Sequence, residues 1–160
     1  MPLAGHVQDE TAADNAVARQ RRLSVLAKAP GKDLLALWKQ TGLDPEVELL
    51  RGPESGLVAL RGRIGGGGQP FHAGEMSATR VTVRIGSGQV GHAMIGGRDA
   101  RKAQLVAVID ALAQDPDHAG MIERDIVAPL ERLADAADAK LREETAATRV
   151  NFFTMVRGED

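Results

Sequence analysis

The side chains best suited to anion chemistry in this 160-residue chain are arginines that recur at strand spacing. Arg80 and Arg84 fall on one face of an alternating segment, and Arg98 follows Gly96-Gly97 at the predicted start of a helix. The guanidinium fork matches phosphate and carboxylate groups, and the free N–H groups of a helix N-terminus favour anions. Arg80, Arg84 and Arg98 are therefore candidates for facing an anion or a triphosphate. The alternative is a solvated sheet face whose arginines form ion pairs.

Other motifs for nucleotide, metal or covalent chemistry are incomplete. The segment Gly86–Gly91 fits the GxGxxG pattern, but it is predicted to join two strands, whereas the nucleotide motif joins a strand to a helix. The chain has no cysteine, which excludes disulfides, thiolate metal sites and a cysteine nucleophile. No metal site is predicted, because the histidines lack paired helical spacing with each other or with carboxylates. These histidines are His6, His72, His92 and His118. No catalytic residue is predicted.

A second candidate surface is the apolar C-terminal segment 148–158. It holds two of the three phenylalanines of a chain that is only 2% aromatic. A monomer rarely leaves such a patch in water, so the segment either folds back on its own core or inserts into a partner. In a partner, aromatic and arginine side chains are the expected hot spots. The candidate interface residues are Arg149, Val150, Phe152, Phe153, Met155 and Arg157.

The elements that must position these residues indicate an α+β fold, with an antiparallel sheet of about four strands in the middle of the chain. Two-residue alternation predicts the strands, and short glycine turns join them as a meander. The predicted strands are 46–51, 56–64, 79–85 and 89–95, with the second half-buried and paired to the first as a hairpin. Helical spacing of apolar residues predicts the flanking N-terminal and C-terminal helices. Asp99 is the expected N-cap of the first helix after the sheet.

Length and composition predict one domain. Residues 1–18 form a polar lead-in, frayed or helical, and residues 19–160 form a single α+β domain that ends in the apolar docking tail 148–158. The chain is 43% hydrophobic and 26% charged with a formal net charge of -2, which is typical of a globular protein and gives no reason to expect nucleic-acid binding. No apolar run is long enough to span a membrane. A cytoplasmic location is expected.

Several blocks, in this order, resemble the PhnG family, the small G subunit of the bacterial carbon–phosphorus lyase core complex. The blocks are Phe71-His-Ala-Gly74, Thr79-Arg80 with Val83-Arg84, Gly97-Arg98-Asp99, Ile109-Asp-Ala-Leu112, Ala128-Pro-Leu130 and Thr148-Arg-Val-Asn-Phe-Phe-Thr-Met-Val-Arg-Gly158. The resemblance covers roughly Arg19 to the C-terminus, and the last block is the most specific. The chain departs from the family pattern at His72, Gln104 and Asn151.

The resemblance implies a subunit of α-D-ribose 1-methylphosphonate 5-triphosphate synthase. With the H, I and L proteins, such a subunit takes part in transferring the ribose 5-triphosphate moiety of ATP to an alkylphosphonate, with release of adenine. The implied partners are the H, I and J subunits, most directly the I subunit, and the ABC-type L protein. The iron–sulfur cluster and S-adenosylmethionine belong to the J subunit, so this chain binds no cofactor alone. The alternative is a stand-alone homodimeric binding or regulatory protein without catalysis.

Overall fold

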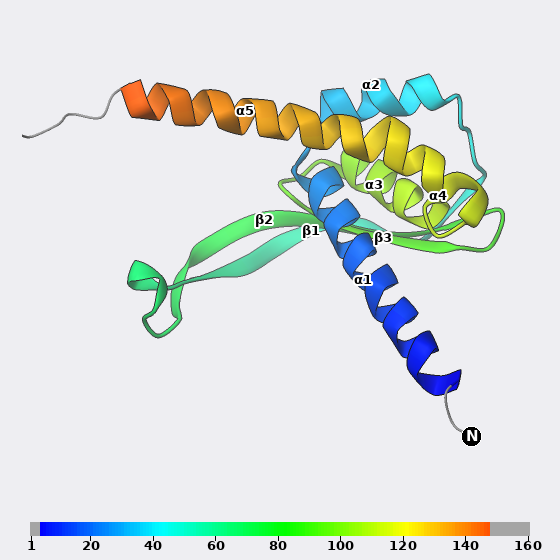
Figure 1. Cartoon of the computed structure of the whole chain (residues 1–160), viewed down its shortest axis with the longest axis horizontal. Helices are drawn as coiled ribbons and strands as arrows, with labels where there is room; N and C mark the ends of the chain where they lie inside the picture. The colour runs from blue at the N-terminus through cyan, green and yellow to red at the C-terminus, as the bar shows by residue number, and fades with distance from the viewer. Residues whose placement is uncertain (1–3, 148–160) are drawn as a thin grey trace, which may run out of the picture.

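The computed structural model describes the backbone of residues 4–147 and the side-chain surroundings of residues 14–147 apart from Gly66. The elements follow one another as α1 (Ala4–Lys28), α2 (Gly31–Thr41), β1 (Val47–Gly62), η1 (Ile64–Gly66), β2 (Phe71–Ile85), β3 (Val90–Gly96), α3 (Ala100–Leu112), α4 (Pro116–Ile122), η2 (Glu123–Val127) and α5 (Ala128–Ala147). The helices lie on one side of the sheet, with α3 next to it and α2 and α5 farther out (Figure 1). Across residues 4–147, no helix has the length and apolar character that a bilayer crossing requires.

The sheet is antiparallel, in the order β1-β2-β3, which confirms the predicted fold class. The glycine segment 86–91 forms the hairpin between β2 and β3, where the Ile85 N–H donates to the carbonyl oxygen of Gln89 at 3.1 Å. Gly88 has φ +96°, a conformation that residues with a side chain rarely adopt. The GxGxxG pattern is therefore a strand turn, as its position between two alternating segments predicts.

The prediction of about four strands is wrong by one, because β1 runs unbroken through Gly52-Pro53, where the sequence indicates a hairpin turn. The register against β2 shifts between Leu49 and Arg51 and again between Arg51 and Glu54. Each shift places one extra residue in β1, which is the definition of a β-bulge. A bulge accommodates proline, which has no N–H to donate, and β1 is an edge strand where proline is tolerated.

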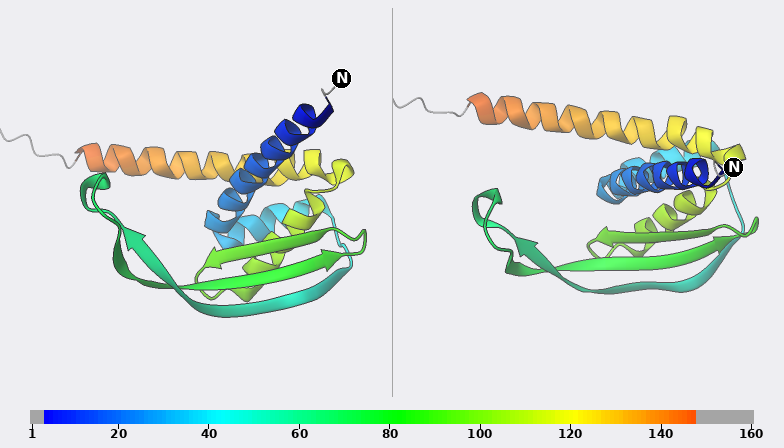
Figure 2. Two further views of the ribbon diagram at one scale, coloured as in Figure 1. Left: turned by 90° about the horizontal axis from the view of Figure 1, so that it is seen from below. Right: turned by 60° about the horizontal axis from the view of Figure 1, so that its bottom comes forward.

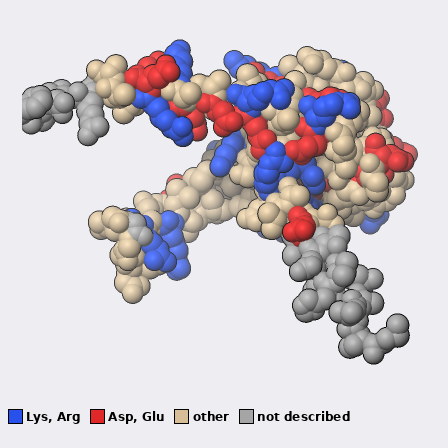
Figure 3. Space-filling view, viewed as in Figure 1, with Lys and Arg blue, Asp and Glu red and all other residues tan. Residues whose placement is uncertain are grey.

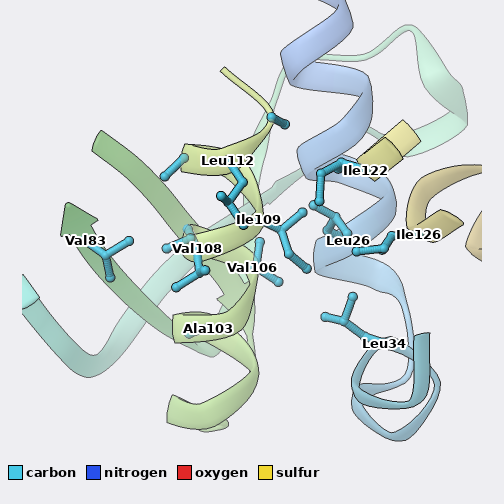
Figure 4. Packing of buried hydrophobic residues seen from close by; sticks show 14 of the residues in the cluster. Leu26, Leu34, Val83, Ala103, Val106, Val108, Ile109, Leu112, Ile122 and Ile126 are labelled. Atoms are coloured by element: carbon cyan, nitrogen blue, oxygen red, sulfur yellow. The ribbon is translucent and has the colours of Figure 1, made fainter. Parts of the chain in front are cut away.

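Helix α3 packs directly on β2 and β3, and the core lies between them and the surrounding helices. Val83 of β2, Ile109 of α3, Leu26 of α1, Leu34 of α2 and Ile126 of η2 converge there and are buried (Figure 4). Asp99 caps α3 as predicted: its carboxylate accepts from the N–H of Lys102 at 2.9 Å. The core therefore joins segments from both ends of the described chain.

Helix α1 continues without a break across residue 18, so the predicted polar lead-in is helical from Ala4 onward. Only its C-terminal half has described side chains, and these attach it to the body. Arg21 donates to Glu123 at 2.6 Å and also to Glu131 at the start of α5. The helix ends at Lys28, shortly before Pro30.

Two elements extend beyond the body of the molecule on the same side (Figures 1 and 2). The first is the ribbon formed by residues 57–77, here called the β arm, where β1 and β2 pair with each other beyond the reach of β3. The second is the free half of α5, residues 132–147, whose side chains are all exposed. The predicted half-buried strand 56–64 is correspondingly wrong about burial, because Leu57 is 65% exposed and no other element of the described chain covers this part of the sheet.

Candidate functional site

Arg80 and Arg84 lie together on the face of β2 that points away from α3. Each stands directly opposite a glutamate of β1 in the strand register: Arg80 faces Glu54 and Arg84 faces Glu48. The Nε of Arg80 lies 3.0 Å from Oε1 of Glu54, and Nη1 of Arg84 lies 3.1 Å from Oε2 of Glu48. Opposite charges at facing positions of an antiparallel pair stabilise the sheet modestly.

Glu54 also accepts a hydrogen bond from Nε of Arg51 at 2.7 Å. The hydrogen bonds from Arg51 and then Arg80 lower the pKa of Glu54, so its carboxylate stays ionised well into acidic solution. A phosphate group approaching Arg80 or Arg84 must therefore compete with carboxylates that are already bound. This arrangement matches the alternative of an ion-paired sheet face, and anion binding by these arginines stays a prediction.

Arg98 lies at the opposite end of β3 from the residue that pairs with Arg84. Arg84 pairs with Val90 at the first residue of β3, whereas Arg98 follows the last residue, Gly96. Seven residues of extended chain span roughly 20 Å. A single compact anion therefore cannot contact Arg84 and Arg98 at once, although Arg98 is exposed beside the start of α3.

The predicted partner-interface residues of the C-terminal segment lie outside the described part of the chain. They are Arg149, Val150, Phe152, Phe153, Met155 and Arg157. The last described residue, Ala147, stands at the end of α5 that is farthest from the body (Figure 1).

The carboxylate of Asp110 on α3 is a buried charge that the sequence motifs did not predict, and its side chain is 0% exposed. Arg19 of α1 donates two hydrogen bonds to this carboxylate, from Nε to Oδ1 at 2.9 Å and from Nη2 to Oδ2 at 2.6 Å. The backbone N–H of His92 on β3 donates to Oδ2 at 3.0 Å. The bond to Asp110 raises the pKa of Arg19. Asp110 thus links α1, α3 and the free edge of β3.

A sequence signal for this link exists, because Asp110 is the sole charged residue in the apolar run 105–113. A carboxylate that is buried with its apolar neighbours needs charged or N–H partners, since an unpaired buried charge is very costly. Gln114, one turn later, donates from Nε2 to the Val90 carbonyl oxygen at 2.8 Å and so satisfies a second edge group of β3. The arrangement is structural, because the carboxylate is fully buried and both of its oxygens already accept hydrogen bonds.

Beside this link lies a groove of about 840 Å³ between α1 and the α3–α4 turn. Arg22 lines it, and its Nε is shielded from solvent with no hydrogen-bond acceptor among the described residues. Burial in this groove lowers the pKa of Arg22, because its guanidinium is partly removed from water. The remaining polar groups of the groove include Asn15, Gln20 and Gln114. None of the described residues that line the groove is a nucleophile paired with a base.

Within the part of the chain that the structure describes, no group of three or more histidine, aspartate or glutamate side chains is placed to hold a metal ion. Nδ1 of His118 lies 2.9 Å from Oδ2 of Asp115, which is the N-cap residue of α4. Its hydrogen bond lowers the pKa of Asp115. The surfaces that stand out in the described chain are therefore the uncovered β arm and the free half of α5.

Comparison with known proteins agrees with the blocks in the sequence. The family model described as "Phosphonate metabolism protein PhnG" matches residues 17–158. A protein of Rhizobium meliloti (strain 1021), named alpha-D-ribose 1-methylphosphonate 5-triphosphate synthase subunit PhnG, is 47% identical over 152 residues, which cover 94% of this chain and 97% of that protein. The match extends over the fold described above and past its C-terminal end. The chain belongs to the PhnG family of phosphonate metabolism proteins.

Proposed function

We propose that this chain is a subunit of α-D-ribose 1-methylphosphonate 5-triphosphate synthase. The observation that carries the proposal is the 47% identity to the Rhizobium meliloti subunit over nearly the whole of both chains. Identity that extends from end to end supports the same role in the same kind of assembly more strongly than a shared core would. The enzyme joins an alkylphosphonate to the ribose 5-triphosphate moiety of ATP and releases adenine.

In the proposed reaction a phosphonate oxygen bonds to the anomeric carbon of the ribose as the bond from that carbon to adenine breaks, and adenine leaves with a proton. The H, I and L proteins are the proposed co-subunits, and the I subunit is the proposed direct neighbour. We place the iron–sulfur cluster and S-adenosylmethionine of the later cleavage step on the J subunit. A chain without cysteine has no thiolate to ligate such a cluster.

The role we propose for this chain is to hold the enzyme together rather than to carry out its chemistry. Two features support that role. The carboxylate of Asp110 is fully buried and is bound by Arg19 and the His92 N–H, so substrate cannot reach it. The described chain also exposes apolar side chains on two projecting elements, which is typical of a subunit with a partner.

The test is reconstitution from separately purified subunits. Combining this chain with the H, I and L proteins should give a complex that releases adenine from ATP and methylphosphonate, and omitting the chain should abolish release. A chain truncated after Ala147 should lose both co-purification and adenine release. Full turnover without this chain would refute the proposal, and assembly that survives truncation would move the interface away from residues 148–160.

Light scattering of the chain alone separates this proposal from a stand-alone homodimeric binding or regulatory protein. A synthase subunit should recruit the other proteins whatever its own oligomeric state. A stable dimer that ignores the H and I proteins would favour the regulatory alternative.

A further inference from the structure

The groove between α1 and the α3–α4 turn contains an arginine, Arg22, whose guanidinium has no hydrogen-bond acceptor in the described chain. Its Nε is shielded from solvent and unpaired. A shielded polar group without a partner costs folding free energy, and a bound ion or ligand is one way in which proteins satisfy such a group. The groove has a volume of about 840 Å³, within the range of about 300–1,000 Å³ that is usual for small-molecule sites. The unsatisfied arginine therefore lies where a ligand has room to bind.

Arg19 supplies a second cation to the same groove. Arg19 and Arg22 are three residues apart on α1, so their side chains are neighbours on one face of the helix. The hydrogen bonds from Arg19 to Asp110 use only its Nε and Nη2. A guanidinium has five N–H donors, and the Arg19 side chain is 35% exposed, so its Nη1 is available to a ligand. Two guanidinium groups can thus donate to one bound group.

The other described residues that line the groove carry no charge. Three of them are amides, Asn15, Gln20 and Gln114. Nε2 of Gln114 already donates to the carbonyl oxygens of Val90 and Asp110, whereas the amides of Asn15 and Gln20 can donate to a ligand or accept from it. The rest of the wall is apolar and consists of Ala16, Ala18, Leu23, Ala113, Pro116 and Ala119. No carboxylate among these lining residues would repel an anion.

The carboxylates around the groove do not replace the missing acceptor. They are Asp110, Glu123 and Asp115, and each is already hydrogen-bonded to another side chain. Asp14 is exposed to solvent and does not line the groove. Burial lowers the pKa of Arg22 more than Asp110 and Glu123 raise it, so these carboxylates do not make up for the water that the guanidinium has lost. Basic and acidic side chains lie next to each other where α1 crosses the body (Figure 3), so an anion would be held by the unused donors of Arg22 and Arg19 rather than by a net positive charge.

We propose that this groove binds a small oxyanion, a molecule with a phosphate, phosphonate or carboxylate group, with Arg22 as the main donor and Arg19 as the second. A planar guanidinium suits such groups because two of its N–H donors match two oxygens. The amides of Asn15 and Gln20 are placed to contact the rest of the molecule. The inference goes beyond the proposed function, because it gives a ligand site to a chain whose proposed role is to hold the enzyme together. It is independent of assembly, since this chain alone supplies every residue of the groove.

Calorimetric titration of the isolated full-length chain at low ionic strength tests the site, with inorganic phosphate, methylphosphonate and acetate as probes. Wild type should bind at least one of them with a dissociation constant of roughly 1 mM or tighter. At ten times that concentration, the melting temperature should rise by roughly 3 °C. Arg22→Gln should weaken binding about tenfold or more and should leave the melting temperature of the unliganded chain nearly unchanged, because it removes a charge that has no partner. The matched control is Arg142→Gln, which removes one exposed positive charge from α5 and should bind like wild type.

A second variant, Ala119→Leu, narrows the groove while leaving both arginines in place, and it should also weaken binding. Preference for phosphate and methylphosphonate over acetate would identify a tetrahedral oxyanion as the ligand, and the reverse preference a carboxylate.

Failure of wild type to bind any of the three probes would overturn the proposal. So would equal affinity in wild type and both groove variants, or an equal loss of affinity in Arg142→Gln. Binding that appears only after truncation at Ala147 would assign the groove to the carboxylates of residues 148–160 and would also overturn it. Assembly with the other proteins and adenine release are measured separately, so the proposed function and the anion site can each fail while the other stands.

Discussion

The carboxylate of Asp110 joins three elements through three hydrogen bonds, although it is one side chain in an apolar helix. Its contribution to the stability of the fold depends on whether its hydrogen-bond partners are present. Replacing a whole buried ion pair by apolar groups can be nearly neutral, whereas removing one partner strands the other charge. Arg19 is partly exposed and can reach water when its partner is lost, but Asp110 cannot. The two partners should therefore respond differently to substitution.

We predict that Arg19→Met lowers the free energy of unfolding by about 3–5 kcal/mol, because it leaves a fully buried carboxylate without its cation. Asp110→Asn should cost less, roughly 1–3 kcal/mol, since the amide oxygen still accepts from the His92 N–H. Urea denaturation at neutral pH measures both. If Asp110→Asn proved the more damaging change, the carboxylate would not be the group that depends on Arg19.

Substitution of Arg80 and Arg84 tests whether these surface arginines bind an anion. The double variant Arg80→Ala/Arg84→Ala should lower adenine release or assembly if these side chains face a triphosphate or an acidic partner. The matched double variant Glu48→Gln/Glu54→Gln removes the competing carboxylates and should preserve or raise that activity. Both variants should fold, because exposed ion pairs contribute little stability. Unchanged turnover and assembly in the alanine variant would contradict anion binding and would mean that these arginines only form ion pairs on the sheet.

At the level of elements, the contact of α3 with β3 depends on Gly91. A Cβ atom at this position would lie 1.9 Å from the carbonyl oxygen of Ala107 and 2.7 Å from the backbone nitrogen of Ala111. Both are backbone atoms of α3 and cannot rotate away. The absence of a side chain therefore lets the helix approach the strand closely enough for Asp110 to reach the His92 N–H.

We predict that Gly91→Ala lowers the free energy of unfolding by about 3 kcal/mol or more, at the upper end of overpacking effects, because a whole helix must shift. The control is Gly120→Ala in α4, where an added Cβ meets nothing within 4 Å. That change should be neutral or stabilising, since alanine favours a helix over glycine. Thermal unfolding followed by circular dichroism compares the two. Similar melting temperatures would mean that α3 adjusts without cost.

Patterns that local physics controls could be predicted at this scale. The alternation in 79–85, the hairpin glycines and the Asp99 cap are all present in the structure. The predicted hairpin of strands 46–51 and 56–64 is wrong, because a bulge and a hairpin turn use the same residue types, such as Gly52-Pro53, and differ only in the register with a distant strand. Burial of the β arm could not be predicted either, since alternation shows which face is apolar and not whether anything covers it.

For the whole molecule, the sequence predicted the fold class and the family better than the site. Asp110 could have been found as a lone acid in an apolar run, but its partner Arg19 is 91 residues away in the chain. Such a pairing depends on the packing of α1 across α3, which periodicity within either helix does not determine. The projection of the β arm and of the free half of α5 could not be predicted for the same reason, because the exposure of a segment depends on how the whole fold packs.

The long-range attachment of α1 has a further consequence during synthesis. Its arginines bind carboxylates that lie 91, 102 and 110 residues later in the chain. At roughly 5–20 residues per second, translation leaves α1 waiting about 5 to 20 s for these partners to emerge. During that interval Leu26 and its apolar neighbours are without their core. Nascent chains are thus most vulnerable to aggregation during this interval, and chaperones that bind exposed apolar helices should bind them at that stage.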